Sequence, residues 1–271
     1  MKVGIAGFSG SGKSTAFHWL TGARPDPAAS QRGQIGIARI ADERLDWLSA
    51  HFKPKKTTPA TIEFLDTPGL LPTERRDNPR RLGIMRDANG LVIVLNGFGG
   101  GAIVAELRQF REEMLFADLE IVSNRISRLE DQGKKPKPAK EREADQQELA
   151  LLKHVTAGFE QGKPASAMNL KPEEEKAVRS FQLLTLKPEF VLVNIGEDRI
   201  GKPLPAELLQ LAPTALQAPV KLELELADLG QEDRKAFMAD LGLSDFLRDQ
   251  VIRSLYSAMG RIVFFTVGED E

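Results

Sequence analysis

A glycine-rich loop near the N-terminus has the residue types and spacing of a phosphate-binding site. Residues 7–14 fit the pattern G-x-x-x-x-G-K-[ST], with Lys13 and Ser14 at its end. Glycines let successive backbone N–H groups turn toward phosphate oxygens, while the lysine reaches the β- and γ-phosphates and the hydroxyl ligates Mg²⁺. A plain Gly/Ser turn is the alternative, and a strand before and a helix after speak against it. The predicted phosphate-binding residues here are Phe8, Ser9, Gly10, Ser11, Gly12, Lys13, Ser14 and Thr15.

A second candidate group follows the apolar segment 61–65, in the sequence Asp-Thr-Pro-Gly-Leu of residues 66–70. An acid at the end of a strand beside the phosphate-loop strand is placed to hold Mg²⁺, and we expect Asp66 in that role. Gly69 would donate its N–H to the γ-phosphate. The alternative is a turn that Asp66 merely caps. Many GTP-hydrolysing switches carry a water-orienting glutamine next, whereas Leu70 has no hydrogen-bonding side chain, so hydrolysis would need a different group.

The third candidate group is Asn194-Ile195-Gly196-Glu197, after the apolar segment 190–193. A GTPase carries Asn-Lys-x-Asp here, and its aspartate accepts from the N1–H and amino group of guanine. Glu197 is longer by a methylene and would not reproduce that pair of bonds. We therefore predict base binding by Asn194, Ile195 and Glu197 with a preference for ATP over GTP, against the alternative of an ordinary polar loop.

Composition narrows the class of protein. The 271 residues include no cysteine and three histidines, which excludes disulfides, thiolate nucleophiles and Cys-ligated zinc and disfavours a His-rich metal site. A net charge of −2 argues against a dedicated nucleic-acid binder, and we expect no DNA partner. No apolar run approaches the ~20 residues of a membrane span. We expect a cytoplasmic protein with no membrane contact; the sequence leaves the oligomeric state open.

The elements that must position these groups follow an α/β pattern. Apolar segments separated by helical stretches predict a mostly parallel sheet with helices on both faces. Trp19 and Trp47 lie in helical patterns, and we predict them to be core or half-buried rather than base-stacking platforms. The expected strands are 2–6, 35–40, 61–65, 91–95, 190–195 and 219–224.

One block departs from that pattern. Apolar residues recur at helical spacing over 107–129, a lysine-rich break follows at 133–142, and a second stripe covers 149–159. This predicts an antiparallel helical hairpin inserted between two strands, a coiled-coil domain of residues 103–184 within a nucleotide-binding domain of 1–102 and 185–263. The alternative is an ordinary pair of surface helices. Two basic clusters are candidate phosphate or RNA contacts or plain solvated surface: Arg75, Arg76, Arg80 and Arg81, and Lys134, Lys135, Lys137 and Lys140.

Together the motifs resemble the YchF family, also called Obg-like ATPases, P-loop proteins of the translation-factor class that prefer ATP through an Asn-x-x-Glu motif. The resemblance implies Mg²⁺, a ribosome or RNA partner, and a TGS domain that would start at 264–271. Leu70 matches the family's hydrophobic replacement for glutamine. Further matching segments are Arg44-Leu45-Asp46, Phe52-Lys53-Pro54, Thr58–Phe64, Ala117–Glu120, Leu184–Pro188 and Val251-Ile252-Arg253.

Several positions depart from the family. Gly10 stands where an asparagine is usual, and Ser30 is the nearest candidate for the metal-binding threonine of switch I. The family's histidine, proposed to assist hydrolysis, lies in an acidic loop, and this chain has the glycine-rich run 97–101 there. Residues 220–222 replace the usual Ser-Ala beside the base. Nucleotide binding is thus better supported than hydrolysis.

Three hypotheses follow. The first is a purine nucleoside triphosphate-binding switch that binds ATP, with GTP less favoured, and hydrolyses it slowly. The second is a module that binds nucleotide with little or no hydrolysis. The third is a small-molecule P-loop kinase, which the order of the Asp-Thr-Pro-Gly and Asn-x-x-Glu motifs disfavours.

Overall fold

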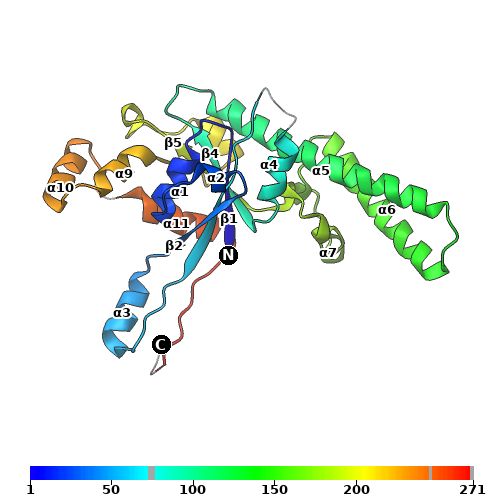
Figure 1. Cartoon of the computed structure of the whole chain (residues 1–271), viewed down its shortest axis with the longest axis horizontal. Coiled ribbons are helices and arrows are strands. Elements are labelled where there is room, and N and C mark those ends of the chain that lie inside the picture. The colour runs from blue at the N-terminus through cyan, green and yellow to red at the C-terminus, as the bar shows by residue number, and fades with distance from the viewer. Residues whose placement is uncertain (73–76, 244–245, 269–271) are drawn as a thin grey trace. The chain divides into compact units, whose positions relative to one another are not determined.

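The computed structural model describes residues 1–72, 77–243 and 246–268. The chain forms two compact units, one of Met1–Glu106 and Pro188–Glu271 and the other of Leu107–Lys187. Figure 1 shows the sheet of the first unit and the long helices of the second. None of the described helices combines the length and the apolar character that crossing a membrane would require.

The first unit is built on a six-stranded sheet with the order β2-β3-β1-β4-β5-β6. Only β2 and β3 pair antiparallel; the four other neighbouring pairs are parallel. The predicted α/β class with a mostly parallel sheet is therefore confirmed. The strands are β1 (Lys2–Ala6), β2 (Gln34–Arg39), β3 (Thr61–Asp66), β4 (Gly90–Asn96), β5 (Glu189–Asn194) and β6 (Leu216–Ala218).

Continuous apolar runs explain the central strands. All residues of β4 except the last are buried, as parallel strands covered on both faces require. Alternate strand residues such as Val3, Phe64 and Val92 share one core cluster with residues of α1, α9 and α11. The helices of this unit are α1 (Lys13–Thr21), α2 (Pro27–Ser30), α3 (Glu43–Phe52), α4 (Asn78–Met85), α8 (Ala206–Leu211), α9 (Val220–Ala227), α10 (Gln231–Asp240) and α11 (Leu247–Ala258), with the 3₁₀ turn η5 (Glu197–Arg199).

The five expected strands from 2–6 to 190–195 are confirmed to within a residue at either end. The expectation of a strand at 219–224 is wrong, because β6 precedes it and α9 occupies it. The run Val-Lys-Leu-Glu-Leu-Glu-Leu alternates as a strand would, yet the buried residues are Val220, Glu223 and Leu226, three apart as on a helix. Burial of Glu223 is stabilised by the indole N–H of Trp19, which donates to Glu223 Oε2 at 2.9 Å.

The two tryptophans differ. Trp19 is buried in the core, as predicted, with 4% of its surface exposed. The prediction for Trp47 is wrong, because its side chain is 62% exposed. The reason is that α3 has no buried residue, so a helical apolar pattern does not mean a core position there.

The second unit consists mainly of two long helices, α5 (Ile103–Gly133), whose first turn belongs to the first unit, and α6 (Ala139–Glu160). They run antiparallel, as the ribbon in Figure 1 shows, around a core that includes Val122, Leu152 and Phe159. The buried Asp118 accepts hydrogen bonds from the backbone N–H groups of Leu184 and Thr185 at 3.0 and 2.8 Å. The remaining elements are α7 (Pro172–Val178), η2 (Ala165–Ala167), η3 (Arg179–Phe181) and η4 (Leu184–Leu186).

Candidate nucleotide-binding site

The phosphate loop connects the end of β1 at Ala6 to the start of α1 at Lys13. Gly12 has a φ of 88°, in the left-handed region that side chains disfavour. A Cβ at Gly12 would lie 2.1 Å from Nδ2 of Asn194, so a second residue of the site occupies the space beside it. The structure therefore requires glycine at this position of the motif and brings the loop against the end of β5.

Lys13 is buried at the start of α1, with 6% of its surface exposed. Its ammonium donates a hydrogen bond to the carbonyl of Phe8 at 2.6 Å, which holds the side chain across the loop. Burial lowers the pKa of Lys13 to about 8, because removal from water disfavours the charged form, while the charges of Asp66 and Glu106 oppose that shift. A phosphate would restore the charged form.

Ser14 and Asp66 meet at the predicted metal position. The hydroxyl of Ser14 donates to Oδ2 of Asp66 at 3.2 Å, and Asp66 is fully buried at the end of β3. A hydroxyl and a carboxylate are hard oxygen donors that suit Mg²⁺. No cluster of three or more His, Cys, Asp or Glu residues lies in the described ranges 1–72, 77–243 and 246–268. Such a pair fits a Mg²⁺ ion that completes its shell with phosphate oxygens and water.

Ser30, the other predicted metal ligand, is the last residue of α2, and its side chain lies outside the described part of the structure.

The segment after β3 lies against the phosphate loop. Leu70 donates its N–H to the carbonyl of Gly7 at 3.1 Å and accepts from the N–H of Ser9 at 2.8 Å. Its side chain is fully buried, so it contacts core rather than water. A Cβ at Gly69 would lie 2.5 Å from Nζ of Lys13, which places this glycine directly beside the phosphate-binding lysine.

Of the two residues of the arginine run that the structure describes, Arg81 contacts this region. A guanidinium N–H of Arg81, on α4, donates to the carbonyl of Gly69. The positive charge of Arg81 also contributes to lowering the pKa of Lys13. Arg80 is exposed to solvent. Arg75 and Arg76 lie outside the described residues.

The base-recognition residues are arranged unequally. Asn194 is buried and its amide donates to the carbonyl of Ser11 at 3.2 Å, which ties β5 to the phosphate loop. Ile195 is buried and donates its N–H to the carbonyl of Ala218 at 3.0 Å. Glu197, by contrast, is exposed on the turn η5. The structure therefore brings Asn194 to the loop and leaves Glu197 accessible to a ligand.

The structure adds two residues to this site. Phe98, 49% exposed, lies beside the loop: a Cβ at Gly12 would be 3.6 Å from its ring, and one at Gly196 would be 3.6 Å from its Cβ. The sequence analysis did not single out Phe98, although an aromatic residue within a glycine-rich run could have identified it as a candidate.

Glu106 had no such signal, because it is one acid among many on a long helix. Its Oε2 accepts from the N–H of Asn96 at 3.0 Å at the end of β4. Burial raises the pKa of Glu106, while that hydrogen bond and the charge of Lys13 act against the shift. Glu106 thus supplies negative charge close to the phosphate-binding lysine.

Comparison with known proteins is consistent with this site. Residues 2–125 match the family model described as a 50S ribosome-binding GTPase. Relatives named ribosome-binding ATPase YchF include those of Bacillus subtilis, 28% identical over 296 residues, and Escherichia coli O157:H7, 29% identical over 292 residues. Each alignment covers 100% of this chain and 79% of the relative.

A solved structure shares the fold. The YchF GTPase of Schizosaccharomyces pombe superposes with a TM-score of 0.81 at 24% identity, covering 100% of this chain and 78% of that one. The alignments with relatives named YchF cover this whole chain. The site geometry agrees with them, since Lys13 of the phosphate loop and Asp66 beside it are both buried. Over its whole length the chain is therefore similar to the YchF, or Obg-like, family of nucleotide-binding proteins.

Proposed function

We propose that the protein is a switch that binds ATP with Mg²⁺, hydrolyses it slowly and couples the nucleotide state to the ribosome. The observation that carries the proposal is the buried Lys13, whose ammonium is held across a glycine loop beside Gly69. Burying a lysine costs free energy unless an anion compensates. A nucleotide phosphate supplies that anion, so the loop is organised for phosphate binding.

Each residue of the site has a role in this proposal. Lys13 and the amides of the loop neutralise phosphate charge, and the positive end of α1 adds to that field. Ser14 and Asp66 would hold Mg²⁺, and Ser30 is a further proposed ligand. A bound Mg²⁺ would supply charge neutralisation on the phosphate oxygens. The N–H of Gly69 is proposed to sense the γ-phosphate.

Selection of the base is assigned to the other end of the site. We propose that Asn194, Ile195 and Glu197 bind adenine, while Phe98 offers an aromatic ring next to the loop. The exposed position of Glu197 supports this role, because a buried and bonded carboxylate would not be accessible to a base. ATP is favoured over GTP for the stereochemical reason given above.

Slow turnover is proposed because Leu70 is buried and cannot orient water. The alternative of a binding module with little or no hydrolysis rests on the same residue. The kinase alternative has less support, since the site resembles that of a switch at three separate motifs.

The link to the ribosome comes from the relatives, which are named ribosome-binding ATPases. We propose a ribosomal or RNA partner for this chain on that basis, and a cytoplasmic location with it.

Calorimetry with ATP and GTP in the presence of Mg²⁺ tests the proposal, together with single-turnover hydrolysis. We expect Lys13→Ala to weaken ATP binding by about 100-fold or more, because a charged phosphate contact is lost. Lys153→Ala on α6, whose side chain is 56% exposed, is the matched control and should bind normally. Tighter binding of GTP than ATP would contradict the adenine assignment, and turnover that requires a phosphate acceptor would favour the kinase.

A further inference from the structure

Helix α3 presents a stack of aromatic rings to solvent. The rings of Trp47 and His51 are parallel to within 5°, with centroids 5.1 Å apart, and Phe52 meets His51 edge-on at 4.8 Å. Trp47 is 62% exposed and Phe52 is 54% exposed. Large aromatic side chains are rarely left this open in a folded domain without a partner.

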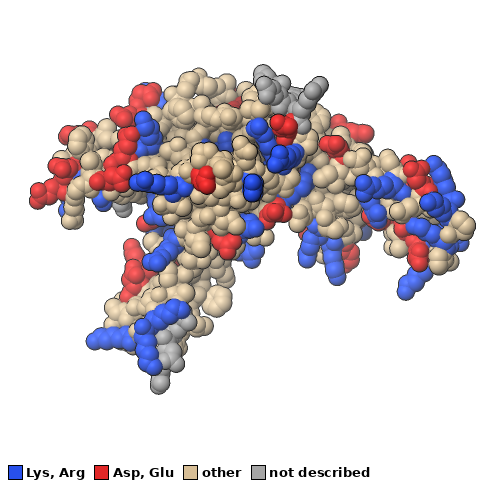
Figure 2. All heavy atoms as spheres, viewed as in Figure 1, with Lys and Arg blue, Asp and Glu red and all other residues tan. Residues whose placement is uncertain are grey.

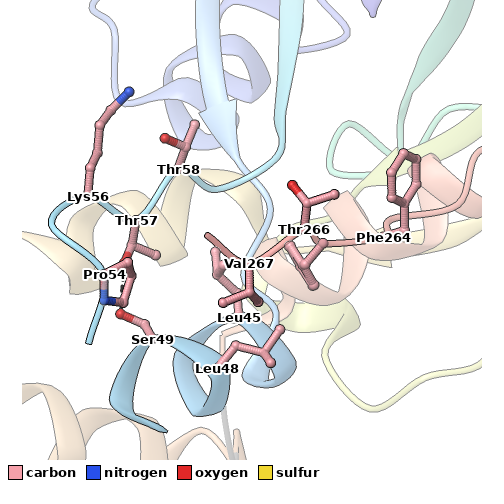
Figure 3. Close-up of a pocket in the computed structure, with 11 residues that line it drawn as sticks. Leu45, Leu48, Ser49, Pro54, Lys56, Thr57, Thr58, Phe264, Thr266 and Val267 are labelled. Atoms are coloured by element: carbon pink, nitrogen blue, oxygen red, sulfur yellow. Dashed lines mark hydrogen bonds between the residues drawn. The ribbon is translucent and has the colours of Figure 1, made fainter. Parts of the chain in front are cut away.

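Packing explains only the opposite face of the helix. Leu45 and Leu48 line a pocket of about 240 Å³ together with the C-terminal segment around Phe264 and Val267, as Figure 3 shows. Neither Trp47 nor His51 lines this pocket, and Trp47 lies two positions from Leu45, about 200° around a helix of 3.6 residues per turn. The leucines therefore fix α3 in place, and the aromatic stack has no role in the core.

The segment that follows the stack carries charge of one sign, whereas Glu43 and Asp46, both exposed, precede Trp47 on the same helix. Lys53, Lys55 and Lys56 follow the helix, and residues 47–62 contain no Asp or Glu. All three lysines are exposed, and Figure 2 shows basic side chains gathered at the far end of α3. In Figure 3 the Lys56 side chain points away from the C-terminal segment. An aromatic surface beside three cations complements a ligand that combines flat rings with negative charge.

We propose that the α3 tip, meaning Trp47, His51, Phe52 and the three lysines, binds single-stranded RNA. Unpaired bases would stack on the exposed rings while the lysines contact the flanking phosphates. A protein partner fits less well, because lysine is depleted in the centre of protein interfaces. Duplex RNA also fits less well, since its base faces are already stacked. The inference rests on the proposed function only in taking a ribosome as the setting.

Binding of a fluorescein-labelled, mixed-sequence 12-nucleotide RNA to the full chain tests the proposal, without ATP and at low salt. We expect Trp47→Ala to weaken binding by about 5- to 100-fold, the range for loss of one stacked base. The double change Lys55→Ala and Lys56→Ala should reduce the slope of log affinity against log salt by about 1.4. Phe237→Ala on α10, where the ring is 53% exposed, is the aromatic control and should bind as the unmodified chain does.

Tryptophan fluorescence gives a second readout that general electrostatic attraction would not produce. The chain has two tryptophans, and Trp19 is only 4% exposed, so quenching by RNA would report on Trp47. We expect the quenching to disappear in Trp47→Ala. Circular dichroism and melting should confirm that this variant folds, since alanine favours a helix.

Three outcomes would overturn the proposal. The first is an RNA affinity within twofold of the unmodified chain in Trp47→Ala, for example with binding lost in Lys134→Ala with Lys135→Ala instead. The second is equal affinity for a 12-base-pair duplex without quenching. The third is loss of ribosome cosedimentation in Trp47→Ala with unchanged RNA affinity, which would indicate a protein partner. Lys13→Ala should retain RNA binding, so failure of the nucleotide proposal and failure of this one are distinguishable.

Discussion

The two ends of the nucleotide site differ in how firmly they are built. At the phosphate end, Lys13, Ser11 and Asp66 are buried, and the loop is bonded to the segment after β3 at two backbone positions. At the base end, Glu197 stands exposed on a single 3₁₀ turn. The phosphate end is thus preorganised, whereas recognition of the base depends on side chains that the fold leaves accessible.

Asn194 connects the two ends. It ends β5, where the base-recognition motif starts, yet its amide bonds to the phosphate loop at Ser11. Since the bond is buried, its loss would leave a polar group without a partner and would disturb both ends together. The difference between the two regions is therefore one of burial and hydrogen bonding, and Asn194 links them.

The largest expected effect comes from a substitution at Gly12 that disturbs its contact with the Asn194 amide. Gly12→Ala should weaken ATP binding by about 100-fold or more, because a Cβ with a φ of 88° would be strained and would collide with the Asn194 amide. Calorimetric titration with ATP and Mg²⁺ measures the loss.

Gly10→Ala provides the matched control. Gly10 has a φ of 86°, so alanine pays the same backbone strain, but a Cβ there would have nothing within 4 Å. We expect Gly10→Ala to lose at most about 5- to 30-fold in affinity, given a backbone cost of about 1–2 kcal/mol. Equal losses in the two variants would mean that strain alone decides and that contact with Asn194 is unimportant.

The unequal construction also explains which features the sequence revealed. The phosphate loop was predictable because its backbone geometry requires glycine at fixed spacing. The central strands were predictable because short, continuous apolar runs are typical of strands buried on both faces of a sheet. Contacts between distant segments were not. The hydrogen bond from the Asn194 amide to the carbonyl of Ser11 could not be predicted, since no local pattern reports a bond between residues 183 positions apart. Glu106 was missed for the same reason.

Two predictions from local sequence patterns were wrong, the strand at 219–224 and the buried or half-buried position of Trp47. Residues 220–226 alternate like a strand, yet they form α9, on which the buried Glu223 accepts hydrogen bonds from Trp19 and from the backbone N–H of Leu247. Trp47 fits a helical stripe, but the stripe faces no core. In both cases the missing information is which surface the element packs against, which the sequence of that element alone does not contain.

The next prediction sharpens the phosphate side through pH. Since burial lowers the pKa of Lys13 to about 8, the free protein loses the ammonium charge as pH rises above that value. Phosphate binds the charged form, so ATP affinity should be steady below about pH 8 and fall by about tenfold per pH unit above it. Calorimetry from pH 7.0 to 9.5 measures this, and proton uptake on binding should appear at the alkaline end.

Lys13→Arg is the control for this pH dependence. Arginine keeps its charge throughout the range, so its ATP affinity should be independent of pH even if it is lower throughout. An ATP affinity of the unmodified chain that stays constant up to pH 9.5, as the ordinary lysine pKa of 10.5 would give, would show that Lys13 is not desolvated.

The smallest expected effect concerns the base side. Glu197→Gln should reduce the preference for ATP over GTP by about tenfold, equivalent to roughly 1.4 kcal/mol, while leaving overall triphosphate affinity close to that of the unmodified chain. The reason is that Glu197 is accessible and lies apart from the buried groups that bind phosphate. Competition between ATP and GTP for the same protein sample measures the ratio directly. Asp198→Asn, on the same turn and also exposed, removes an equal charge and should leave the ratio unchanged. If both variants changed the ratio alike, general electrostatics rather than contact with the base would account for nucleotide choice. The buried phosphate end and the exposed base end would then not have the separate roles proposed for them.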